Sequence, residues 1–89
     1  MSQIIGKRVF KSPHSLDPGE YCFDGDRWWA ACPIDRDSNG FICLANLKKH
    51  NVVENLDGTI TVLPSILVSD TKGNQLWHGY LEKGVWREC

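Results

Sequence analysis

Residues 76–88 read LWHGYLEKGVWRE, and this stretch decides the fold class of the chain. Two runs rich in apolar residues, Leu76–Leu81 and Val85–Glu88, flank a turn that ends in Gly84. The pattern predicts an antiparallel β-hairpin, because glycine accepts the backbone conformation that a tight turn requires. Trp77 and Trp86 lie on the two arms, and we expect their rings to pair across the strands.

Similar short runs of β-branched and aromatic residues continue toward the N-terminus, separated by turn-forming Gly, Pro, Asp and Asn. In the run Thr59–Leu63 the side chains of Ile60 and Val62 share one face, and Pro64 predicts a bulge or a sheet edge before Ile66. The expected strands cover Ile4–Phe10, Tyr21–Phe23, Arg27–Cys32, Phe41–Leu44, Val52–Glu54, Thr59–Leu63, Ile66–Ser69, Leu76–Leu81 and Val85–Glu88.

The fold class follows from this pattern. We expect residues 1–89 to form a single small, mostly β domain, an antiparallel meander that curls into a sandwich or open barrel. At most one short helix is expected, at Ala45–His50. A core of this size supplies only about 3–5 kcal/mol of net stability. We therefore expect a homo-oligomer, in which a partner subunit adds to the core.

Charge is nearly balanced overall, with a formal net charge of −1. No strong basic field would attract duplex DNA or an anionic membrane, so neither is expected as a partner. The stretch Asp17–Asp37 carries six acids against two arginines. This acidic stretch either keeps the protein soluble, which we favour, or binds a partner protein.

The N-terminal segment lacks the apolar run of a signal peptide, so we expect a cytoplasmic protein with reduced cysteines. Cys22, Cys32, Cys43 and Cys89 are widely spaced and form no C-x-x-C pair. This spacing argues against a zinc ribbon and against a thioredoxin-like redox site.

Two residue sets could still bind a metal. Asp35–Ile42 matches the first eight positions of a calcium-binding EF-hand loop, but Asn46 stands where the bidentate carboxylate belongs. We favour the alternative, a hairpin stabilised by Asp and Asn side chains and closed by Asn39-Gly40. A zinc site from Cys32, Asp35, His78 and Cys89 would require distant strands to converge. We predict no metal and no cofactor.

Enzyme motifs are absent from the sequence: it contains no nucleophile elbow, phosphate-binding loop or paired helical carboxylates. We predict a non-catalytic protein without catalytic residues. Trp28 and Trp29 are adjacent in an expected strand and should point to opposite faces, one buried and the other available to a ligand or partner. An exposed tryptophan beside Arg27 suits stacking on a flat ring, with the guanidinium on a phosphate.

Three short segments carry a resemblance: Cys32-Pro33, Leu63-Pro64-Ser65-Ile66, and Trp77-His78-Gly79-Tyr80 followed by Gly84-Val85-Trp86. Over roughly Trp28 to Cys89 the chain resembles a loosely defined group of small, functionally uncharacterised phage and prophage proteins. The resemblance implies a metal held by a C-P-x-C pair, a Cys-His pair and a terminal Cys. Here Asp35 and Trp77 replace two of those cysteines, so we expect hydrophobic packing in place of the metal.

The resemblance also implies a role against the host, such as blocking a defence complex, through stoichiometric binding in the host cytoplasm. Our leading hypothesis is sequestration of a small anionic ligand, such as a signalling nucleotide, at an oligomer interface. The alternatives are a module that caps a host protein through the acidic stretch and Trp28 or Trp29, and a metal-stabilised structural domain. The expected ligand-binding residues are Arg27, Trp28, Trp29, Ser65, Trp77, His78 and Arg87.

Overall fold

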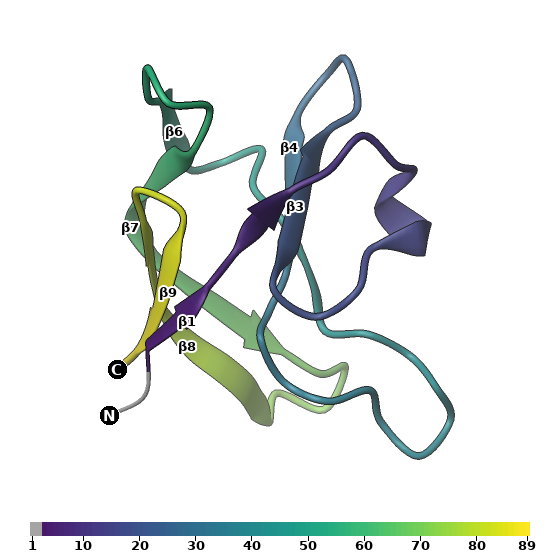
Figure 1. Ribbon diagram of the computed structural model, residues 1–89. Coiled ribbons are helices and arrows are strands. Elements are labelled where there is room, and N and C mark those ends of the chain that lie inside the picture. The colour runs from purple at the N-terminus through teal and green to yellow at the C-terminus, as the bar shows by residue number, and fades with distance from the viewer. Residues whose placement is uncertain (1–2) are drawn as a thin grey trace.

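The computed structural model describes residues 3–89 as nine strands in two sheets (Figure 1). The first sheet has the order β1-β9-β8-β7-β6 and the second has the order β2-β3-β4-β5. One short 3-10 helix, η1 (Pro13–Ser15), lies between β2 and β3. The strands are β1 (Gln3–Ile5), β2 (Lys7–Arg8), β3 (Glu20–Phe23), β4 (Trp28–Ala31), β5 (Leu44–Asn46), β6 (Asn51–Glu54), β7 (Ile60–Ser69), β8 (Gln75–Glu82) and β9 (Val85–Glu88).

The mostly β fold class is confirmed, and β8 and β9 form the predicted hairpin, with Leu81 opposite Trp86. The topology differs from a simple meander in two places. β1 pairs with β9, which is the last strand of the chain, and β2 runs parallel to β3. The sheets pack on one another without closing into a barrel, because β1, β2, β5 and β6 remain edge strands.

The predicted strand Ile4–Phe10 is divided, because the chain leaves one sheet and joins the other at Gly6. The Gly6 amide N–H donates to the Gly84 carbonyl at 2.7 Å, and the next amide, that of Lys7, donates to Gly19 at 3.2 Å. A Cβ atom on Gly6 would lie 2.8 Å from the Trp86 indole nitrogen. Figure 1 shows this segment running from β9 toward β3.

The predicted helix Ala45–His50 is wrong. Ala45 is buried in a strand that pairs with β4, and the Leu47 amide extends that ladder by donating to the Trp28 carbonyl at 3.0 Å. The Asn46 side chain then accepts a hydrogen bond from the Lys48 amide, which turns the chain toward β6. The strand expected at Phe41–Leu44 begins later, because the Phe41 amide donates to the Asp37 side chain and not to a neighbouring strand.

Residues 60–69 form one strand, β7, where two were expected on either side of Pro64. The predicted irregularity is confirmed, because the register between β7 and β8 shifts between Val62 and Ile66. The first half of β7 also pairs with β6, from Ile60 to Leu63. β7 therefore bends at the proline while its core-facing side chains stay buried.

Two hydrophobic clusters hold the domain together. The larger lies between the sheets and includes Tyr21, Leu81, Trp77 and Trp86. The smaller lies on the other face of β3 and β4, where the segment from Val9 to Leu16 covers it. The β3–β4 hairpin is therefore buried on both faces, which explains its nearly continuous run of apolar residues.

Trp77 and Trp86 meet as predicted, with ring centroids 5.2 Å apart and planes 85° apart. Gly79 makes this contact possible. A Cβ atom there would lie 2.5 Å from the Trp77 ring and 2.4 Å from the Arg87 carbonyl oxygen. The large ring therefore lies over the glycine on the same face of β8, in the space that a side chain would fill.

We predict that Gly79→Ala destabilises the protein by about 1–3 kcal/mol, since overpacking of this kind displaces a core side chain or the backbone. Urea unfolding followed by tryptophan fluorescence measures the loss. Ser69→Ala, at an exposed position of β7, serves as a control and should leave the midpoint unchanged. An unchanged midpoint for Gly79→Ala would contradict the packing described here.

The Trp86 indole N–H donates to the Gly19 carbonyl at 2.9 Å, in a buried position. We predict that Trp86→Phe lowers the free energy of unfolding by about 1–3 kcal/mol, because it leaves the Gly19 oxygen without this donor. Trp29→Phe, which removes an exposed indole hydrogen bond, is the matched control and should cost less. Equal losses in the two variants would show that the buried hydrogen bond contributes no more to the free energy of unfolding than the exposed one.

Candidate functional site

The seven predicted ligand-binding residues do not form one site. Arg27 and Trp28 line a groove between the β3–β4 hairpin and the start of β6. Ser65 and His78 are hydrogen-bonded to each other on β7 and β8. The other three residues, Trp29, Trp77 and Arg87, lie elsewhere.

Phe23 and Trp28 form one wall of the groove. They are directly opposite each other on β3 and β4, so their side chains leave the hairpin on the same face. Their ring centroids are 5.3 Å apart. The Arg8 guanidinium lies 5.0 Å from the Trp28 ring centroid and donates to Glu54 at 2.7 Å, which fixes the tryptophan against β6.

The turn from β5 to β6 forms the opposite wall. Here the His50 amide donates to the Leu47 carbonyl at 3.0 Å, and Lys48 and Lys49 are exposed between them. The groove has a volume of about 230 Å³. Its lining residues are Phe23, Asp26, Arg27, Trp28, Leu47, Lys48, His50 and Val52.

A second hollow of about 310 Å³ adjoins the groove at this turn. Its lining residues are Asn46, Lys48, Lys49 and His50. Lys48 and His50 belong to both linings, so the two depressions share a boundary.

The side chains that line the groove and the hollow carry more positive than negative charge. Arg27 makes two hydrogen bonds to the Asp26 carboxylate, at 2.6 and 2.8 Å, which offsets its charge. Neither Lys48 nor Lys49 forms an ion pair with any residue from 3 to 89. Their ammonium groups therefore remain available to an anion.

His50 connects the groove to the other predicted pair. Its Nε2 lies 3.2 Å from the Ser65 carbonyl oxygen, so Nε2 carries the proton in this contact. Its Nδ1 is buried and lacks a partner among the described residues. On the neighbouring strand, the Ser65 hydroxyl lies 2.9 Å from His78 Nε2, and the Cys89 sulfur lies 4.0 Å from the same nitrogen.

Ser65 therefore contacts the groove residue His50, and neither Ser65 nor His78 lines the groove. A serine hydroxyl within hydrogen-bond reach of an imidazole is a geometry that nucleophilic enzymes also use. In this chain the Ser65 oxygen and the Cys89 sulfur both face the same ring nitrogen, which has a single lone pair or a single proton. The hydroxyl and the thiol therefore compete for this one nitrogen, and the three groups do not form a proton relay.

The remaining three residues have local partners. The Trp29 indole donates to the Asp24 carboxylate at 2.7 Å, on the face opposite Trp28, where the ring packs on the smaller core cluster. Trp77 is 2% exposed and offers no surface to a ligand. The Arg87 guanidinium lies 5.1 Å from the Tyr80 ring centroid and pairs with Glu82.

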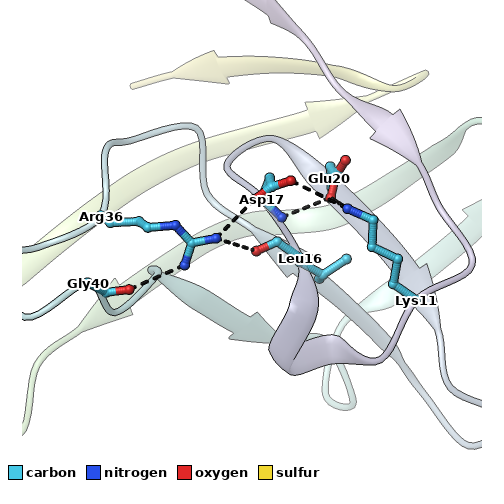
Figure 2. A network of polar contacts seen from close by, with 6 residues as sticks. All are labelled: Lys11, Leu16, Asp17, Glu20, Arg36 and Gly40. Carbon is cyan, nitrogen blue, oxygen red and sulfur yellow. Dashed lines mark hydrogen bonds and ion pairs between the residues drawn. The ribbon is translucent and has the colours of Figure 1, made fainter.

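The acidic stretch Asp17–Asp37 is largely engaged by its own neighbours (Figure 2). Asp17 contacts both Arg36, at 3.0 Å, and Lys11, which also contacts Glu20 at 2.8 Å. The hydrogen bonds from Arg36 and Lys11 hold the pKa of the Asp17 carboxyl below its usual value. Lys11 from outside this stretch and Arg36 from within it thus offset part of the negative charge that the sequence places there.

The loop with partial EF-hand spacing is a hairpin of the expected alternative kind. The Asp37 carboxylate accepts hydrogen bonds from the Asn39 and Phe41 amides, at 2.8 and 2.9 Å, and Gly40 has a φ of 82°. Within residues 3–89, no group of three or more His, Cys, Asp or Glu side chains has a geometry that would hold a metal ion. Of the four residues considered for zinc, His78 and Cys89 lie 4.0 Å apart, but they form no group of three or more possible ligands with Cys32 or Asp35.

Sequence reasoning missed Phe23, Lys48, Lys49 and His50. The run Lys48-Lys49-His50 carries a visible signal, two adjacent cations followed by a histidine. The expected helix at Ala45–His50 hid this signal, since a helix would have spread these side chains around its axis. The pairing of Phe23 with Trp28 depends on the register of the hairpin, which the sequence pattern alone does not fix.

Comparison with protein-family models, with curated proteins and with solved structures finds no match. Among the residues that the structure describes, no helix has the length and apolar character needed to cross a membrane.

Three of the four thiols are buried, and Cys89 is exposed. A hydrogen bond with Cys43, together with burial, raises the pKa of the Cys32 thiol, and burial raises the pKa of Cys22. We predict that Ellman's reagent modifies Cys89 rapidly in the folded protein and the other three thiols only on unfolding, because burial keeps the reagent from their sulfur atoms. Cys89→Ser should abolish the fast phase; a fast phase that survives it would contradict the burial.

Proposed function

We propose that this protein is a non-catalytic binding protein that sequesters a small anionic ligand bearing a flat ring, such as a signalling nucleotide. The observation that carries the proposal is the juxtaposition, in one groove, of the Phe23–Trp28 wall with the unpaired cation Lys48. Aromatic side chains stack on bases, and lysine ammonium groups bind phosphate oxygens. Together they match the two chemical halves of a nucleotide.

The groove suits binding more than turnover. It is a surface depression whose walls come from a hairpin and a turn, and its lining includes aromatic and cationic side chains. Stacking and charge pairing fix a ligand without any proton transfer. Given the resemblance of the sequence to small phage and prophage proteins, we extend the proposal to an accessory role, in which the protein removes a host signal used in defence.

A homo-oligomer is the form that we propose for the active protein. On β6 and β7 the apolar side chains of Val53, Leu63 and Leu67 are about half exposed, and they lie on the outer face of the five-stranded sheet. Contact between copies through such side chains would add buried apolar area to a small core. This part of the proposal is separable from ligand binding.

The alternative of a host-protein cap has weaker support, because the acidic stretch is already paired with Lys11, Arg27 and Arg36. The alternative of a metal-stabilised domain has no ligand set in residues 3–89. Neither alternative is favoured by a specific contact, so the nucleotide proposal takes precedence.

The test is a thermal-shift panel of mono-, di- and cyclic nucleotides, followed by calorimetry of those that stabilise the protein. We predict that Lys48→Gln/Lys49→Gln weakens binding at least about tenfold, or about 1.4 kcal/mol, because both unpaired cations are lost. Lys72→Gln/Lys83→Gln removes the same charge from exposed turns elsewhere and should leave the affinity within about twofold.

The two outcomes that oppose the proposal are distinct. If no nucleotide shifts the unfolding temperature, the nucleotide proposal is lost. If binding occurs but both double variants weaken it equally, the effect is one of net charge and the groove is not the site.

A further inference from the structure

The two adjoining depressions differ in chemistry, and the difference indicates which part of a ligand each would hold. The groove has the aromatic wall of Phe23 and Trp28. The hollow is lined by Asn46, Lys48, Lys49 and His50, without a Phe, Tyr or Trp from the described chain. A flat ring therefore finds a stacking partner in one depression and not in the other.

Hydrogen-bonding character divides the depressions in the same way. In the hollow, Lys48 and Lys49 can only donate, and the Asn46 oxygen already accepts the Lys48 amide at 3.0 Å, which leaves its NH₂ group to donate. In the groove, Asp26 binds Arg27 through Oδ2, so Oδ1 remains free to accept. An acceptor on the ring side suits the amino group of a base, whereas the donors on the other side suit anionic oxygens.

Size requires that a ligand use both depressions. Small-molecule sites occupy about 300–1,000 Å³, and the groove alone, at about 230 Å³, lies below that range. The hollow adds about 310 Å³, and the two meet at Lys48 and His50. A ligand that starts on the aromatic wall can thus continue past Lys48 toward Lys49.

We propose that the ligand class is a nucleoside polyphosphate, with its base in the groove and its phosphate chain in the hollow. This inference rests on the proposed function and narrows it. A cyclic dinucleotide, which has two bases, fits less well because its second base would lie against lysines. A nucleoside monophosphate would leave Lys49 without a partner, since Lys49 lines only the hollow and not the groove.

Isothermal titration calorimetry with adenosine, AMP, ADP, ATP, tripolyphosphate and cyclic di-AMP tests this assignment, with the guanine series run in parallel. We predict that affinity rises along each series with phosphate number, by at least about tenfold from the monophosphate to the triphosphate. Tripolyphosphate alone should bind more weakly than ATP or GTP, because it forgoes stacking. Cyclic di-AMP should bind no better than AMP.

Single variants assign the two halves of the site. Lys49→Gln should reduce the affinity for the triphosphate toward that for the monophosphate and leave the monophosphate unaffected. Phe23→Leu should weaken the monophosphate and triphosphate by the same factor, because both place a ring in the groove. Lys72→Gln, an exposed lysine in the turn between β7 and β8, is the matched control for the loss of one charge.

The outcomes separate this inference from the proposed function. Absence of binding by every nucleotide defeats both. Equal affinities for AMP and ATP, or tighter binding of cyclic di-AMP than of ATP, with the Lys48→Gln/Lys49→Gln effect retained, would keep the groove and overturn the polyphosphate assignment. Tripolyphosphate binding as tightly as ATP would show an anion site only and would overturn the ring assignment.

Discussion

The buried hydrogen bond from the Trp86 indole to the Gly19 carbonyl is the constraint on which the arrangement of the two sheets depends. It joins the last strand, β9, to the loop that precedes β3, across 67 residues of sequence. The ring fills the space between the sheets, and Gly6 passes beside it because no side chain would fit there. An apolar ring of the same size would fill the volume but leave the Gly19 carbonyl without a donor. The indole suits this position because it combines a large apolar ring with an N–H donor.

The position of the groove follows from that arrangement. The β3–β4 hairpin is packed on both faces, so its twist and register are held from the two core clusters. Phe23 and Trp28 leave the hairpin at its turn end, where the larger cluster ends and β6 of the other sheet approaches. The short turn from β5 to β6 must cross from one sheet to the other at this point. Lys48 and Lys49 therefore lie beside the aromatic pair because the chain crosses between the sheets there. A ligand can contact the rings and the lysines together.

Much of the fold was predictable from local signals, and the parts that were not depend on contacts between distant residues. The 76–88 hairpin, the irregularity at Pro64 and the Asp37 loop follow from alternation and turn chemistry. The change of sheet at Gly6 does not, since it depends on the Trp86 ring. The site shows the same division. Arg27 and Trp28 stand out in the sequence itself. The positions of Lys48, Lys49 and His50 beside them depend on Ala45 being a buried strand residue, which the sequence pattern does not predict.

Arg8 gives the two halves of the groove different rigidity. Its guanidinium lies near both Phe10 and Trp28 and donates to Glu54 and to the Gly58 carbonyl, so the tryptophan is held before any ligand arrives. Lys48 and Lys49, by contrast, are exposed and unanchored, and each loses side-chain entropy when it closes on an anion. A ligand would thus bind to an already ordered tryptophan on one side, whereas on the other side binding would have to order the lysine side chains. Selectivity in such a site would lie with the rigid half, and tolerance of different anion lengths with the flexible half.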